Sequence, residues 1–151
     1  MVLEVSCENV EQSLALAIAM GQNLRGGEVI ELVSDVGGGK TTFVRGLAKG
    51  MGSADRVSSP SFTLTNQYRS EKLTMQHFDF YRLAEPGIMR QELAEYIEDA
   101  ATVTVVEWAD IVADVLPVDR VSITIAAESD TGRKYRVTYS DSTKYVVEDI
   151  V

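Results

Sequence analysis

The stretch Ser34-Asp35-Val36-Gly37-Gly38-Gly39-Lys40-Thr41-Thr42 decides the fold of this chain. It lies between an apolar, strand-like run at 28–33 and a run at 43–48 with a helical pattern. A strand, a glycine-rich turn and a helix that opens with Gly-Lys-Thr are typical of a triphosphate-binding loop. Backbone N–H groups of residues without side chains can curl around phosphate oxygens, and the helix N-terminus adds the positive end of its dipole.

The residues of this loop have separable roles. Lys40 supplies a mobile charge for the outer phosphates, and the hydroxyl of Thr41 can ligate magnesium. The usual pattern, G-x-x-x-x-G-K-[ST], begins with glycine, whereas this chain has Ser34 there; a small residue suits the position if its dihedral angles accommodate a side chain. The alternative is a glycine-rich turn that binds nothing, which the strand–loop–helix context disfavours. The predicted nucleotide-binding residues are Asp35, Val36, Gly37, Gly38, Gly39, Lys40, Thr41 and Thr42.

The composition is that of an ordinary globular protein. At 151 residues, the chain is most simply one domain spanning 1–151. Its 14 basic and 23 acidic residues give a net charge of −9, which disfavours direct, non-specific binding to nucleic acid. The chain shows no secretory signal and no apolar run of membrane-spanning length, so we expect a cytoplasmic protein that does not associate with membranes.

Cysteine and histidine each occur once. Cys7 therefore has no intramolecular disulfide partner. Cys7 and His77 together supply only two ligands, fewer than a Cys/His zinc site needs. We expect Cys7 to be a buried small hydrophobic residue in a reducing compartment.

Hydrophobic periodicity predicts an α/β fold with a mixed sheet, and with the loop at 34–42 we expect a P-loop NTPase-like three-layer sandwich. Parallel strands would lie beside the phosphate loop, with antiparallel hairpins added around them. The expected strands are 1–6, 28–33, 61–68, 73–80, 102–106, 120–127, 133–139 and 144–151. The expected helices are 9–25, ending at Gly26-Gly27, then 40–51, ending at Gly52, then 88–98 and 109–115.

A phosphate loop needs an acidic residue to hold magnesium or its water shell, usually at the carboxyl end of a neighbouring strand. Glu107 closes the apolar run 103–106 in that position, and Asp79 ends a second strand-like run. The candidate metal-binding residues are therefore Thr41, Glu107 and Asp79, and the candidate catalytic residues are Lys40, Glu107 and Asp79. As alternatives, Glu107 is an ordinary strand-end carboxylate, and His77, which shares a face with Asp79, is a structural histidine.

Three other features carry weaker signals. The hydroxyl-rich segment 58–63 around Pro60 suits a γ-phosphate sensor, although a turn leading into an edge strand explains it as well. Arg82 is placed to pair with Asp79, to stabilise transition-state charge or to meet a partner. For Trp108, a place in the core is favoured over a place beside the nucleotide.

Together, four ordered motifs resemble the TsaE (YjeE) family of ATPases. They are the loop 34–42, then Ser59-Pro60-Ser61-Phe62-Thr63-Leu64, then His77-Phe78-Asp79-Phe80-Tyr81-Arg82-Leu83, and Val106-Glu107-Trp108. Order and spacing both match, over roughly residues 5–126. That family comprises small bacterial P-loop proteins needed to form threonylcarbamoyladenosine in tRNAs that read codons beginning with A.

The resemblance implies roles for particular residues. Lys40 would hold the β- and γ-phosphates of ATP, Thr41 the magnesium ion and Thr42 the α-phosphate, with Glu107 as the Walker-B-like acid. The implied switch and partner-contact residues are Ser59, Pro60 and Thr63 in a first segment and His77, Tyr81 and Arg82 in a second, with Trp108 beside them. Where the family has glycine, this chain has Ser34, and we expect that difference to bear on affinity or hydrolysis rate.

The resemblance also implies partners. These are the TsaD and TsaB subunits, which transfer the threonylcarbamoyl group to adenosine and which a TsaE-like protein resets with ATP. Contact with tRNA would then run through those subunits, and self-association is possible in the family.

Two alternatives use the same loop. A small-molecule kinase would need a mobile lid rich in arginine, and only Arg56 and Arg69 lie between Ser53 and Leu73. A nucleotide-binding interaction module with little hydrolysis is the other alternative, which Ser34 makes possible. GTP is less expected than ATP, since the Asn-Lys-x-Asp signature for guanine is absent.

Overall fold

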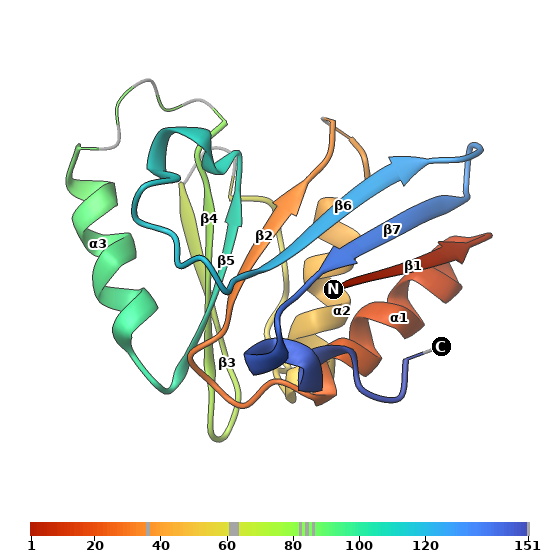
Figure 1. Cartoon of the computed structure of the whole chain (residues 1–151), viewed down its shortest axis with the longest axis horizontal. Helices are drawn as coiled ribbons and strands as arrows, with labels where there is room; N and C mark the ends of the chain where they lie inside the picture. Colours follow the sequence, from red (N-terminus) through yellow and green to blue (C-terminus); the bar gives the residue numbers. More distant parts are fainter. Residues whose placement is uncertain (36, 61–63, 82, 84, 86, 151) are drawn as a thin grey trace.

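The computed structural model describes residues 1–35, 37–60, 64–81, 83, 85 and 87–150. Within them, seven strands form one sheet in the order β1-β7-β6-β2-β5-β4-β3 (Figure 1). The strands are β1 (Val2–Cys7), β2 (Val29–Val33), β3 (Thr65–Arg69), β4 (Thr74–Asp79), β5 (Thr102–Glu107), β6 (Val121–Ala127) and β7 (Arg133–Thr138). The α-helices are α1 (Val10–Gln22), α2 (Lys40–Met51) and α3 (Gly87–Glu98), and the 3-10 helices are η1 (Ala109–Val112) and η2 (Asp141–Val147).

The strand that leads into the phosphate loop lies at the centre of the sheet. β2 pairs in parallel with both β5 and β6, and β5 pairs in parallel with β4. The pairs β3–β4, β6–β7 and β1–β7 are antiparallel. This arrangement confirms the predicted mixed sheet, with parallel strands at the loop and antiparallel hairpins outside them.

Two hydrophobic cores occupy opposite faces of the sheet. Neighbouring residues of a strand point to opposite faces, and on β5 Val105 belongs to one core while Val106 belongs to the other. The first core lies under α1 and α2, where Phe43 of α2 stacks on Tyr135 of β7 with ring centroids 5.2 Å apart. The second lies under α3 and η1 (Figure 1) and contains Leu93 of α3. The three predicted layers are therefore present.

Most predicted elements are confirmed, and the chain ends differently from the prediction. Within 144–150, the part of the expected last strand that the structure describes, there is no strand, because residues 141–147 form the 3-10 helix η2, which begins with a capping box between Ser140 and Thr143. The amide of Asn23 donates to the carbonyls of Val146 and Glu148, at 3.2 and 3.1 Å. These bonds join the end of η2 to the C-cap of α1.

Two helices end earlier than predicted. The first strand of the predicted hairpin, β3, begins at Thr65. Helix α1 stops at Gln22, several residues before Gly26, because Asn23 forms its C-cap. The predicted helix 109–115 is a 3-10 helix that ends at Val112. The start of the predicted strand 61–68 lies partly outside the described residues. By contrast, α2 ends as predicted, with Gly52 as a left-handed C-cap at φ 104°.

Cys7 is buried at the end of β1, as expected, with 4% of its surface exposed. Burial raises the pKa of its thiol, since the thiolate loses more solvation than the thiol does. Among the described helices, none has the length and apolar character needed to cross a membrane.

Candidate nucleotide-binding site

The phosphate loop joins the end of β2 to the first residue of α2. Gly37 and Gly39 adopt left-handed φ angles of +78° and +101°, which explains glycine at both positions. Gly39 is the N-cap of α2 and provides no side-chain hydrogen bond to the helix. The first N–H groups of a helix have no partner within it, so the start of α2 has donors for an anion.

Ser34 fits the position where the usual motif has glycine. It is not among the described non-glycine residues with positive φ, so its backbone tolerates a side chain. Room for its hydroxyl comes from Gly38, where a Cβ would lie 2.4 Å from the Ser34 Oγ and 2.9 Å from the carbonyl oxygen of Asp35. Serine at 34 and glycine at 38 are therefore sterically linked.

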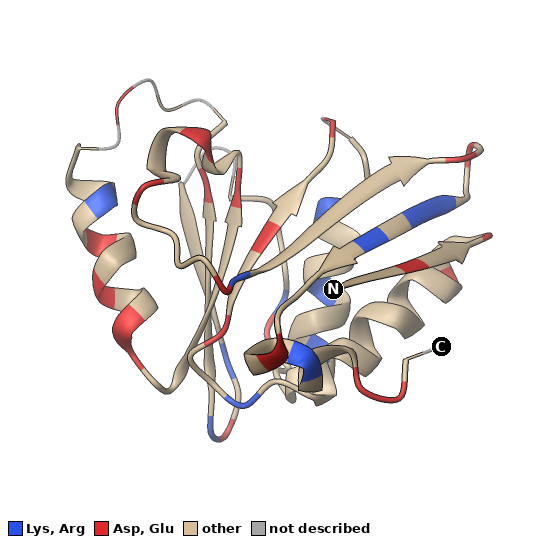
Figure 2. Cartoon of the chain, viewed as in Figure 1, with Lys and Arg blue, Asp and Glu red and all other residues tan. Residues whose placement is uncertain are grey.

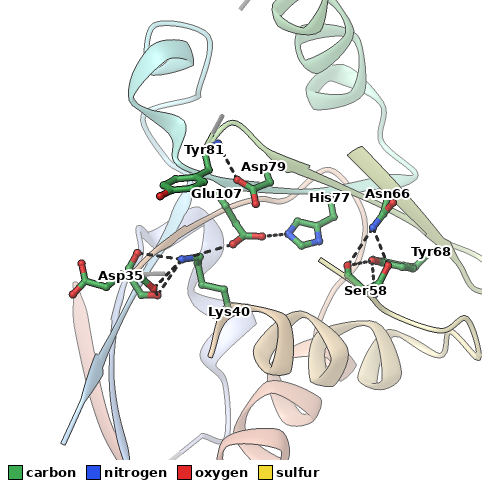
Figure 3. A network of polar contacts seen from close by, with 10 residues as sticks. Asp35, Lys40, Ser58, Asn66, Tyr68, His77, Asp79, Tyr81 and Glu107 are labelled. Atoms are coloured by element: carbon green, nitrogen blue, oxygen red, sulfur yellow. Dashed lines mark hydrogen bonds and ion pairs between the residues drawn. The ribbon is translucent and has the colours of Figure 1, made fainter. Parts of the chain in front are cut away.

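The ammonium group of Lys40 lies between the loop carbonyls and Glu107. Its Nζ donates to the carbonyls of Ser34 and Asp35 at 3.1 and 3.2 Å, and it lies 3.3 Å from the Ser34 Oγ. The same Nζ is 3.9 Å from Oε1 of Glu107 (Figure 3). With 8% of its surface exposed, Lys40 is a buried cation that is held by oxygen atoms on two sides.

The two predicted acids lie side by side at the carboxyl ends of their strands. Asp79 of β4 is in register with Glu107 of β5, and each is 3% exposed. Asp79 accepts a hydrogen bond from the backbone N–H of Tyr81 at 2.9 Å. Oε2 of Glu107 lies 2.5 Å from Nε2 of His77. The structure thus brings Lys40, Glu107, Asp79 and His77 together, although their chemical roles remain predictions.

The predicted alternation along β4 is confirmed. Phe78 and Phe80 both belong to the core under α3, and their rings stack with centroids 5.8 Å apart. His77 is on the opposite face, where its ring lies 6.5 Å from that of Tyr68. One face of β4 therefore packs the core under α3, while the opposite face carries Met75, in the core under α1 and α2, and His77.

Trp108 is half-buried and lies between the core under α3 and Lys40. It packs against the core under α3, and its ring centroid is 5.1 Å from the Nζ of Lys40. Its ring also contacts that of Tyr81, with centroids 4.9 Å apart. A left-handed backbone at Trp108, with φ 54°, ends β5 and starts the 3-10 helix η1. The Lys40 contact has cation–π geometry.

The hydroxyl-rich segment is attached to the β3–β4 hairpin. Asn66 donates from Nδ2 to the carbonyl of Ser58 at 3.1 Å, and the hydroxyl of Tyr68 donates to the same carbonyl at 2.9 Å (Figure 3). The carbonyl of Pro60 accepts from the N–H of Leu64, whose own carbonyl accepts from the N–H of Asp79. The segment is thereby linked to one of the two acids. Among the predicted site residues, Val36, Thr63 and Arg82 lie outside the described residues.

Arg133 is a contact of the loop that sequence reasoning missed. Its Nε donates to the carbonyl of Gly38 at 3.2 Å, and its NH1 group donates to the carbonyls of Ser129 and Gly132 at 3.0 and 2.8 Å. The partners Arg133 and Gly38 are 95 positions apart, and no motif joins them. Only the β6–β7 hairpin brings Arg133 beside the loop.

The residues present suit magnesium held together with a nucleotide. No group of three or more His, Cys, Asp or Glu side chains in the described residues could hold a metal ion alone. Magnesium is commonly held by one or two carboxylates together with substrate phosphates and water, so such a cluster is not required. Thr41, the second residue of α2, and the paired acids Asp79 and Glu107 would be its protein contacts.

Comparisons with known proteins agree with this fold. A family model described as "Threonylcarbamoyl adenosine biosynthesis protein TsaE" matches residues 7–135. A Bacillus subtilis protein named tRNA threonylcarbamoyladenosine biosynthesis protein TsaE is 35% identical over 130 residues, covering 86% of this chain and 81% of that protein. A protein of the same name from Nostoc sp. is 38% identical over 103 residues, and the match spans 66% of this chain and 64% of the Nostoc protein.

Similarity to a solved structure extends over nearly the whole chain. The crystal structure of YdiB from Bacillus subtilis superposes with a TM-score of 0.79 at 28% sequence identity. The superposition covers 99% of this chain and 93% of YdiB. The mixed sheet and its helices are therefore an architecture that this chain shares with YdiB.

Proposed function

Since the chain belongs to the TsaE family of tRNA threonylcarbamoyladenosine biosynthesis proteins, we propose that it is a magnesium-dependent ATPase that acts as a switch on the modifying complex. The observation that carries this proposal is the position of Lys40. Its ammonium group lies against the loop that contains the left-handed residues Gly37 and Gly39, and it is 3.9 Å from the carboxylate of Glu107. A cation, backbone donors and an acid at one point are what binding of a triphosphate requires.

The chain's own residues would mainly position the triphosphate and neutralise its negative charge. Backbone N–H groups of the loop and the start of α2 bind the phosphates, and Lys40 moves from the carbonyls of Ser34 and Asp35 to the outer phosphate oxygens. Thr41, Glu107 and Asp79 would hold the metal ion, whose positive charge offsets charge that develops on the phosphate oxygens. Glu107 also orients a water molecule for attack.

We expect the chain alone to hydrolyse ATP slowly. Arg133, which touches the loop, already donates to three backbone carbonyls and so is not free to reach the outer phosphate. In related phosphoryl transfers, an arginine that reaches the outer phosphate, often from a partner protein, raises the rate by several orders of magnitude. The TsaD and TsaB subunits would therefore raise the rate, or use the bound nucleotide as a signal.

The charge distribution supports an indirect relation to tRNA. Acidic residues recur along α3, which also carries one basic residue, while basic residues recur along β7 (Figure 2). With a net charge of −9, the chain is unsuited to bind a phosphate backbone over a broad surface. We therefore propose that TsaD and TsaB contact the tRNA, and that this chain contacts those subunits.

An ATPase assay with and without TsaD and TsaB, read beside modification of an acceptor tRNA, tests the proposal. Lys40→Ala should abolish phosphate release and leave the circular dichroism spectrum unchanged. Lys49→Ala, at an exposed position near the end of the same helix, is the matched control and should behave as wild type. Phosphate release that is unchanged in Lys40→Ala would overturn the proposal. Tight ATP binding without turnover, even with both subunits, would instead support an interaction module.

A further inference from the structure

The single histidine of the chain is fully buried with one ring nitrogen unsatisfied. His77 is 0% exposed, and its Nδ1 has no hydrogen-bond partner among the described residues. Because a buried polar group without a partner is costly, an apolar residue would suit the interior better at this position. Packing alone therefore does not account for histidine here.

The other ring nitrogen of His77 contacts a carboxylate. Nε2 lies 2.5 Å from Oε2 of Glu107, whose side chain is 4% exposed. The remaining oxygen of that carboxylate, Oε1, is the one that lies 3.9 Å from Nζ of Lys40. With no acceptor at Nδ1, we place the proton on Nε2, which then donates to Glu107. Figure 3 shows Glu107 reaching between His77 and Lys40.

We propose that His77 is a positioning residue for Glu107. The Nε2–H group holds one carboxylate oxygen in place, so that the other faces Lys40 and the metal ion that accompanies the nucleotide. The His77 ring is itself fully buried and lies beside the ring of Tyr68, with centroids 6.5 Å apart. Residues that orient a metal-binding carboxylate raise metal affinity in this way. This inference rests on the proposed function, because it assigns a role toward the proposed magnesium.

Nuclear magnetic resonance of the imidazole tests the geometry without any turnover. In tag-free protein, His77 is the only histidine, so its ring gives a single set of signals. We expect the proton on Nε2, shifted downfield by the carboxylate, and we expect Glu107→Gln to move that signal. Glu31→Gln is the matched control, since Glu31 lies on the adjacent strand and pairs with Arg120. A proton on Nδ1, or a signal that Glu107→Gln leaves unchanged, would overturn the proposal.

Two variants test the consequence for the metal. His77→Gln keeps an N–H group near the position of Nε2, whereas His77→Leu fills the space without one. We expect His77→Leu to raise the magnesium concentration needed for tight binding of a fluorescent ATP analogue by about 10- to 100-fold. His77→Gln should recover most of that loss, and circular dichroism should show both variants folded.

The two proposals fail in different ways. If wild type binds magnesium with the nucleotide but the Gln and Leu variants behave alike, the role of His77 is overturned and the proposed function stands. If wild type binds the nucleotide with no dependence on magnesium, the proposed metal-dependent function is overturned, and the role of His77 toward the metal falls with it.

Discussion

The Nε of Arg133 donates a hydrogen bond to the backbone carbonyl of Gly38 at 3.2 Å, joining two parts of the chain that are 95 positions apart. A loop that presents its N–H groups to an anion must turn carbonyls away from it. Those outward carbonyls need donors from elsewhere in the molecule. Arg133, at the start of β7, is such a donor for the phosphate loop.

Replacing Arg133 should therefore weaken nucleotide binding more than it slows hydrolysis. A hydrogen bond from a charged donor is worth about 1.5–3 kcal/mol, so we expect Arg133→Ala to raise the Kd for ATP by about tenfold or more. Arg133→Lys should recover part of the loss. Arg136→Ala, an exposed position on the same strand that pairs with Glu4, is the control and should leave the Kd unchanged. A fall in kcat at unchanged Kd would contradict this role.

The steric link between residues 34 and 38 predicts a coupled pair of substitutions. Gly38→Ala should greatly weaken nucleotide binding, because its Cβ would meet the Ser34 Oγ at 2.4 Å. Ser34→Gly alone should retain binding, since Lys40 keeps both of its carbonyl contacts. In the double variant, binding should return in part, with the Asp35 carbonyl at 2.9 Å limiting the recovery. Affinities measured for all four proteins test this, and strictly additive losses would refute the link.

Trp108 should report nucleotide binding by its fluorescence. It is the only tryptophan in the chain, and the Nζ of Lys40 lies 5.1 Å from its ring. When Lys40 moves to a bound phosphate, the cation leaves the ring and the emission should change. Titration with a non-hydrolysable ATP analogue measures this change. Lys40→Ala should show a much smaller change, and Lys49→Ala should show the full one; equal changes in both variants would exclude Lys40 as the cause.

Alkaline pH should destabilise the fold through Tyr145. Burial, followed by its hydrogen bond to Glu28, raises the pKa of Tyr145 well above the usual value near 10. Above that usual value the unfolded chain loses the proton while the folded chain keeps it, so the free energy of unfolding falls as pH rises. Tyr145→Phe should be less stable than wild type at pH 8, because the 2.7 Å bond to Glu28 is lost.

Urea unfolding at pH 8 and pH 11 measures that difference. The deficit of Tyr145→Phe should shrink at the higher pH, because only the wild type has this tyrosine to deprotonate on unfolding. Tyr81→Phe, at a half-exposed position, is a control for general effects of tyrosine loss. A deficit that stays constant between the two pH values would contradict the assignment to Tyr145.

The parts of this protein that could be predicted from sequence are those specified by short, contiguous stretches of residues. The glycines, Lys40 and Thr41 are contiguous and lie between a strand pattern and a helix pattern, so the loop and its place in the sheet follow directly. The buried β5 strand follows from its β-branched residues, and the position of Glu107 follows from the end of that strand. The sequence placed Asp79 and Glu107 at the ends of two strands, and the parallel pairing of β4 with β5 that brings them side by side is seen only in the structure.

The remainder depends on contacts that no local pattern records. Residues 144–151 resemble a strand because Tyr145, Val146 and Val147 favour one. The side chain of Asn23 overrides that preference by bonding the carbonyls of Val146 and Glu148, more than a hundred positions away. The same Asn23 ends α1 early. Likewise, the contacts of His77 with Glu107 and of Arg133 with Gly38 arise from tertiary packing.

The burial of Cys7 makes the chain well suited to site-specific labelling. Exposed thiolates attack reagents such as maleimides, whereas only 4% of the Cys7 surface is exposed and burial raises the pKa of its thiol. A cysteine introduced at Val118, which is 99% exposed, would react in preference to it. A dye or spin label could then be attached at one defined place while the native cysteine stays in the interior.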